Sequence, residues 1–160
     1  MQIEIFTTGG TIDKIYFDAK SDYEIGDPQI AELFRDANLT IDYRVTSLLR
    51  KDSLELTDVD RQQIRNAVEK SPARQIVITH GTDTMIITGQ FLQGIAGKTI
   101  VLTGAMQPAR FRFTDAIYNV ASAITAAQTL PPGVYIAMNG QIFDPRNSRK
   151  NVELNRFETI

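Results

Sequence analysis

Short apolar runs alternate along this chain with longer stretches in which apolar residues recur at helical spacing. The apolar runs predict strands at 3–7, 41–46, 76–79, 99–102 and 134–138. The stretches between them predict helices, including 58–70 and 114–128. Strands that alternate with helices build a parallel sheet covered on both faces. We therefore predict an α/β fold, a mostly parallel three-layer sandwich of the flavodoxin-like or Rossmann-like kind.

Local signals support several of these elements. Thr57 precedes the helix at 58–70 with Asp60 three residues later, which is close to a capping box. The helix at 114–128 carries one apolar stripe, expected to face the core, made of Ile117, Val120, Ala121, Ile124 and Ala127. Asn139-Gly140 separates two apolar runs and is typical of a β-hairpin turn. We expect this hairpin to add an antiparallel strand near 134–143.

The polar segment at 13–27 has no apolar periodicity and is longer than a usual connection. It is either a functional lid or a disordered stretch. The remainder contains no linker, so residues 1–160 are expected to form a single domain.

Composition excludes several classes of function. The formal charge is -2, which disfavours binding to nucleic acid or to an anionic membrane surface. The chain has no cysteine and one histidine, so thiol catalysis and the common zinc sites are excluded. The opening residues form an alternating strand instead of a basic start followed by a long apolar stretch, and a cytoplasmic location is expected.

Candidate chemistry follows two of the predicted strands. The hexapeptide His80-Gly81-Thr82-Asp83-Thr84-Met85 places two hydroxyls and a carboxylate directly after the strand at 76–79. Near the start, two glycines and Thr11 follow the strand at 3–7. Because carboxyl ends of parallel strands meet at one sheet edge, we expect the two loops to meet there. Taken singly, each is also consistent with an ordinary turn or a helix N-cap.

Other chemistries fit these loops less well. The glycines lack the spacing of a dinucleotide or phosphate loop, and no cofactor or metal is expected. His80 is the only histidine and therefore the only base open to a Ser-His-Asp mechanism, which is a minor alternative.

Three blocks in order resemble one known family, the amino-terminal domain of bacterial-type L-asparaginases. They are Thr8-Gly9-Gly10-Thr11-Ile12, His80-Gly81-Thr82-Asp83-Thr84 and the segment 98–108. Weaker blocks at 21–23, 52–57 and 144–150 resemble the lid tyrosine, the substrate-carboxylate loop and the lysine segment of the same family. The resemblance covers nearly the whole chain.

This resemblance implies hydrolysis of the side-chain amide of L-asparagine, and possible acceptance of L-glutamine, without a cofactor. By position, Thr11 resembles the primary nucleophile with Tyr23 beside it, and a second triad corresponds to Thr82, Asp83 and Lys150. Residues that resemble the substrate-binding groups are Gly10, Asp52, Ser53, Thr82 and Asp83. The implied partner is a small amino acid, and a homodimer or homotetramer is expected.

The chain also departs from the family. Typical members continue into a second domain that lends an acidic residue to a neighbour's site, so this chain resembles a short-chain form or a truncated one. Asp13-Lys14 replaces small residues after the first block, and Leu54 replaces a polar residue, changes expected to weaken substrate binding. Two alternatives remain: a catalytically silent amino-acid-binding homologue, and the asparaginase-like component of a tRNA-dependent amidotransferase.

Overall fold

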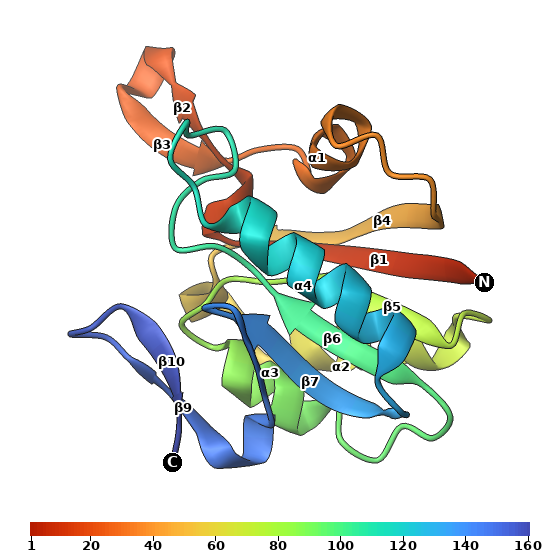
Figure 1. Cartoon of the computed structure of the whole chain (residues 1–160). Coiled ribbons are helices and arrows are strands. Elements are labelled where there is room, and N and C mark those ends of the chain that lie inside the picture. Colours follow the sequence, from red (N-terminus) through yellow and green to blue (C-terminus); the bar gives the residue numbers. More distant parts are fainter.

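The computed structural model describes every residue from 1 to 160, and its centre is a six-stranded sheet (Figure 1). The strand order is β4-β1-β5-β6-β7-β8, and every pairing is parallel except the last. The strands are β1 (Gln2–Gly9), β4 (Asp42–Lys51), β5 (Gln75–Thr79), β6 (Thr99–Thr103), β7 (Gly133–Met138) and β8 (Gln141–Phe143). The predicted strands are therefore confirmed, with β4 longer than its apolar pattern indicates.

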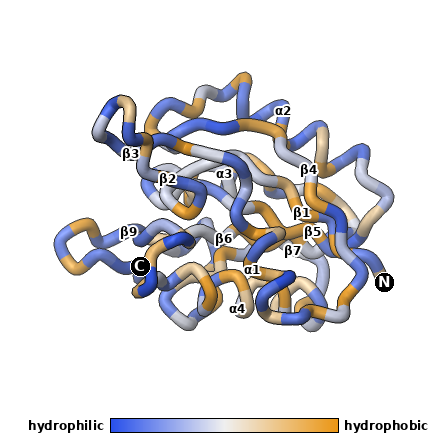
Figure 2. The backbone as a smooth tube through the Cα atoms, turned by 90° about the horizontal axis from the view of Figure 1, so that it is seen from above, coloured by the Kyte–Doolittle hydropathy of each residue, from blue (hydrophilic) through white to orange (hydrophobic).

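Helices cover both faces of this sheet and complete three layers. The helices α1 (Ile30–Asp36) and α4 (Ala116–Thr129) pack on one face, while α2 (Asp58–Lys70) and α3 (Met85–Phe91) pack on the other. Successive side chains of a strand point to opposite faces, so Ile5 joins the core under α1 and α4 whereas Phe6 joins the other. Figure 2 shows the hydrophobic stretches gathered along the central strands. The predicted α/β sandwich is confirmed.

The local sequence signals are confirmed, except at two positions of α4. Thr57 and Asp60 form the capping box at the start of α2, and Asn139-Gly140 makes the turn between β7 and β8 with both residues at positive φ. The prediction that Ile117 and Ala121 belong to the core is wrong, because the side chain of Ile117 is 58% exposed and Ala121 is exposed as well. The short helix α1 covers α4 incompletely and leaves this end of the stripe open.

Two small hairpins project from the central sheet (Figure 1). The first consists of β2 (Lys14–Phe17) and β3 (Asp22–Ile25), so the disordered alternative for segment 13–27 is wrong. Its strands are tied by Tyr16 and Tyr23, which face each other across the ladder with ring centroids 5.4 Å apart. The second, β9 (Ser148–Asn151) with β10 (Arg156–Thr159), was not predicted from the sequence.

Candidate active site

Three loops meet closely at the carboxyl edge of the sheet, after β1, β4 and β5. Gly10 has a φ of 86°, and a Cβ atom added there would lie 2.5 Å from the backbone nitrogen of Gly81. A Cβ atom on Gly81 would in turn lie 2.6 Å from the Cβ atom of Ser53. Glycine is therefore required at both positions, since any side chain would push the loops apart. The glycine loop and the threonine-aspartate loop come together as the sequence indicates.

The side chains of Thr82, Asp83 and Lys150 form one connected group at this edge. The ammonium of Lys150 donates to the Oγ1 atom of Thr82 over 2.8 Å and to the Oδ1 atom of Asp83 over 2.7 Å. The lysine side chain is only 15% exposed, whereas that of Asp83 is 41% exposed. This arrangement places a largely buried positive charge beside a threonine hydroxyl and leaves part of the carboxylate open to a ligand.

The C-terminal hairpin holds Lys150 in this position. Lys150 lies on β9 and pairs in register with Phe157 on β10. The ring of Phe157 is buried against Phe143, with centroids 6.2 Å apart, and its backbone N–H donates to the side chain of Asn139 over 2.8 Å. The β7-β8 hairpin thus anchors β10, and β10 anchors the strand that carries the lysine.

His80 is buried completely beneath the same loop and does not reach the site as a base. Its Nδ1 atom lies 2.7 Å from the carbonyl oxygen of Gly81, and its Nε2 atom lies 2.8 Å from the hydroxyl of Thr88. Burial lowers the pKa of His80 to about 4, so the ring is neutral at physiological pH. A carbonyl oxygen only accepts, so Nδ1 carries the proton and Nε2 accepts from Thr88. The minor alternative of a histidine base is therefore wrong.

The hydroxyl of Thr88 is itself oriented by a second partner, Arg61, whose Nε atom donates to it over 3.2 Å. Arg61 is 5% exposed and comes from α2, while Thr88 comes from α3. Neither residue stands in a recognisable motif, and only the packing of α2 against α3 places them beneath the site.

Thr11 and Tyr23 are not joined in this structure. Thr11 begins the 3-10 turn Thr11–Asp13 and is partly exposed. Tyr23 lies on β3 with 46% exposure, and its ring packs edge-on against Phe111, with centroids 5.7 Å apart. No hydrogen bond links the phenol to the Thr11 hydroxyl, so a catalytic contact between them stays a prediction.

The predicted substrate-carboxylate loop lies directly behind the threonine-aspartate loop. Ser53 is 1% exposed, its Oγ atom accepts the backbone N–H of Thr84 over 3.3 Å, and its carbonyl accepts the Thr84 hydroxyl over 2.8 Å. Asp52 caps the turn by accepting the N–H of Leu54, and its carboxylate lies 3.9 Å from the ammonium of Lys14. These contacts fix the loop, while its binding role stays a prediction.

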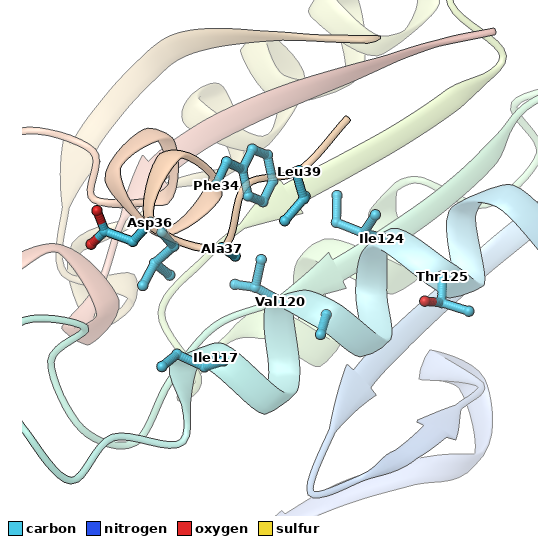
Figure 3. Close-up of a pocket in the computed structure, with 10 residues that line it drawn as sticks. Phe34, Asp36, Ala37, Leu39, Ile117, Val120, Ile124 and Thr125 are labelled. Atoms are coloured by element: carbon cyan, nitrogen blue, oxygen red, sulfur yellow. The ribbon is translucent and has the colours of Figure 1, made fainter. Parts of the chain in front are cut away.

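A mostly apolar hollow with a volume of about 450 Å³ lies elsewhere, between α1 and α4 (Figure 3). Its walls include Phe34, Val120 and Ile124. Figure 3 shows Asp36 and Thr125 well apart along it, so the hollow brings no hydroxyl next to an acid. The chemistry-bearing residues instead gather at the sheet edge. No group of three or more His, Cys, Asp or Glu side chains is arranged to hold a metal ion.

The parallel sheet, with candidate side chains gathered at its carboxyl edge, defines an α/β domain of a known family. The family model described as "Asparaginase, N-terminal" matches residues 2–159, and the chain belongs to this family. None of its helices has the length and apolar character needed to cross a membrane.

Relatives with more than one activity are similar to this chain. The glutaminase-asparaginase of Acinetobacter glutaminasificans is 33% identical over 79% of the chain and 39% of the relative. A component of the glutamyl-tRNA(Gln) amidotransferase of Methanococcus vannielii is 30% identical over 89% of the chain and 35% of the relative. The solved structure of the thermostable L-asparaginase from Thermococcus kodakarensis superposes with a TM-score of 0.87 at 28% identity, covering 100% of this chain. The chain spans about half of that structure and less of the two relatives.

Proposed function

We propose that this domain hydrolyses the side-chain amide of L-asparagine, or of L-glutamine, to the corresponding acid and ammonia. Membership of the asparaginase family supports an amidohydrolase, and the glutaminase-asparaginase relative supports both amides as candidate substrates. Because the chain spans about half or less of these relatives, substrate and rate are properties to be measured on this chain itself.

The contact between Lys150 and Thr82 carries this proposal. A threonine hydroxyl is a weak nucleophile or acid unless a neighbouring cation or base favours its ionised form. The ammonium of Lys150 lies 2.8 Å from that hydroxyl in a poorly hydrated position, and Asp83 fixes the direction of the ammonium. A charge held in this way stabilises an oxyanion more strongly than a charge in water.

The reaction proceeds in two balanced steps. In the first, the Thr11 hydroxyl attacks the amide carbon and its proton passes through Tyr23 to the amide nitrogen. The C–N bond then breaks, which releases ammonia and leaves the acyl group as an ester of Thr11. In the second, water held by Thr82 and Lys150 attacks that ester, which releases the acid and restores the Thr11 hydroxyl. The first step requires Tyr23 to approach Thr11, which a shift of the β2-β3 hairpin on substrate binding supplies.

Substrate contacts follow from the three loops that meet at the sheet edge. The open part of the Asp83 carboxylate receives the α-amine of the substrate. The loop of Asp52 and Ser53, which lies against Gly81, receives the α-carboxylate, and the backbone around Gly10 borders the same space. This geometry favours a small amino acid whose two charged ends lie close together.

Ammonia release by the purified chain tests the proposal. The assay compares L-asparagine and L-glutamine, with Thr82→Val as the variant that removes the hydroxyl at nearly constant volume. Thr125→Val, on the exposed side of α4, is the matched control. We expect Thr82→Val to lose about a hundredfold in rate and Thr125→Val to lose nothing, whereas no ammonia from either amide contradicts the proposal.

A second candidate function is that of a component of a tRNA-dependent amidotransferase. The amidotransferase relative that is 30% identical over 89% of this chain favours it. In that case the amide is hydrolysed in concert with a partner protein that uses the ammonia. Turnover of free amino acid by the chain alone separates the two functions, because the second requires the partner. A silent homologue is distinguished by binding L-aspartate without any turnover.

A further inference from the structure

Asp13 makes hydrogen bonds to three separate segments at the base of the β2-β3 hairpin. Its backbone N–H donates to the carbonyl of Gly10 over 3.1 Å, and its carbonyl accepts the N–H of Gly26 over 2.8 Å. The Oδ1 atom of its side chain accepts the N–H of Gln29 over 2.9 Å. The residue is 2% exposed. One buried residue therefore connects the loop before Thr11 to both the end of the hairpin and the start of α1.

The position of the hairpin depends on its base and on the packing of Tyr23 against Phe111. It consists of two four-residue strands that form a separate two-stranded sheet (Figure 1). A two-stranded hairpin is only marginally stable on its own. Besides Asp13, its base is held by an ion pair between Asp27 and Arg50, with a separation of 2.7 Å. This ion pair is largely exposed and contributes little.

The loop between β6 and α4 also contacts the base of the hairpin. The N–H of Ala109 donates to the carbonyl of Ile12 over 3.0 Å, directly before Asp13. The guanidinium of Arg110 donates to the side chain of Gln29 over 2.9 Å. This loop therefore holds both Ile12, which precedes Asp13, and Gln29, which bonds to its side chain. The Phe111 ring that packs on Tyr23 follows in the same loop.

We propose that Asp13 is a positioning residue for the reaction: its side-chain oxygen fixes the base of the hairpin and thereby sets Tyr23 relative to Thr11. This inference rests on the proposed function of those two residues. Asp13 itself touches no reacting atom. Its side chain makes a contact that a small apolar side chain cannot make, because the Gln29 amide requires an acceptor oxygen.

The acceptor oxygen matters more than its charge. Burial raises the pKa of Asp13 to about 7, although the Gln29 amide and the charge of Arg50 oppose the shift. Near neutral pH the carboxyl therefore exists in both forms, and each form has an oxygen that accepts the Gln29 N–H. Asparagine keeps such an oxygen at the same distance along the side chain. Alanine keeps none and leaves a buried amide without a partner.

Two variants of Asp13 distinguish loss of the acceptor oxygen from loss of the charge. We expect Asp13→Ala to speed hydrogen exchange in residues 14–25 at least tenfold and to lower kcat for ammonia release about tenfold or more. We expect Asp13→Asn to stay within about twofold of the parent in both measurements. Asp18→Ala, at the exposed hairpin tip, is the control and should match the parent. Parent-like exchange in Asp13→Ala overturns the proposal, and so does a folded Asp13→Asn that behaves as Asp13→Ala.

A residue-resolved exchange measurement on the unmodified protein covers the case in which Asp13→Ala does not fold. Gln29 immediately precedes α1, so its N–H has no partner within that helix. Its hydrogen-bond partner is the side chain of Asp13. We expect exchange at least a hundredfold slower than in an unstructured chain, and an unprotected Gln29 amide overturns the proposal. Exchange needs no turnover, so the outcome stands even where no ammonia is released and the proposed function fails.

Discussion

The Nζ atom of Lys150 lies 2.8 Å from the Oγ1 atom of Thr82, although the lysine belongs to a hairpin outside the central sheet. Thr82 follows a buried parallel strand and is fixed by the core. Lys150 is fixed by the packing of Phe157 on Phe143 instead. The candidate site thus joins a rigid sheet edge to a small accessory hairpin, and the order of that hairpin is a condition for activity.

The two threonine loops should differ in what they contribute. Thr11→Ala should lose turnover and still bind L-aspartate, because Asp83 and the Ser53 loop remain in place. Asp83→Ala should lose binding, since its partly exposed carboxylate is the proposed contact for the amine. Calorimetric titration with L-aspartate beside the ammonia assay checks both. Equal binding by the two variants contradicts the assignment of Asp83.

The buried carboxyl of Asp13 should make stability depend on pH. Burial raises the pKa of Asp13 from 3.8 to about 7, so the folded state holds this proton more tightly than the unfolded chain. Its contribution is complete below about pH 4, falls as the pH rises toward 7 and stays constant above. About three pKa units correspond to at most about 4 kcal/mol.

The Asp13→Asn variant removes this titration and keeps the acceptor oxygen. Relative to the parent, its free energy of unfolding should therefore rise between about pH 4.5 and about pH 8. Urea denaturation at the two pH values measures the difference. If the variant differs from the parent by the same amount at both, Asp13 does not titrate between them.

Two neighbouring threonines in the sheet should respond oppositely to the same substitution. The Thr79 hydroxyl is buried without a hydrogen-bond partner, whereas the Thr103 hydroxyl donates to the carbonyl of Ala137 over 2.8 Å. Thr79→Val should stabilise the protein by about 1 kcal/mol, because it removes an unsatisfied group, and Thr103→Val should destabilise it by about 1 kcal/mol. Urea denaturation of both variants decides this, and shifts of the same sign contradict the account.

The central sheet was predictable because its strands are apolar runs bounded by polar loops, and the turn at Asn139-Gly140 has its own sequence signature. The β2-β3 hairpin was not predictable, since Tyr16, Tyr23 and Phe111 stabilise it by contacts between distant segments. The C-terminal hairpin was missed for the same reason, because its one buried apolar side chain, Phe157, is a single residue among polar neighbours.

The candidate site was predictable in part. The glycines and hydroxyls after β1 and β5 indicate a shared edge, because parallel strands end there together. The partnership of Lys150 with Thr82 came from a family resemblance, since no local spacing connects residues so far apart in sequence. The roles of Asp13 and of His80 could not be read from the sequence, because each depends on which buried partner its side chain meets.

Ammonia release by Lys150→Met beside Arg149→Met is the most direct test of the central claim. The two residues are adjacent on β9, but Arg149 pairs with Glu158 on the surface, whereas Lys150 contacts Thr82 and Asp83. Removing one charge from a poorly hydrated site costs on the order of 3 kcal/mol, or about a hundredfold in rate. Lys150→Met should therefore lose about a hundredfold or more in turnover while it stays folded, and Arg149→Met should keep the parent rate. If Lys150→Met retains more than about half of that rate, the lysine charge does not take part in turnover and the proposed Thr82-Asp83-Lys150 chemistry is wrong.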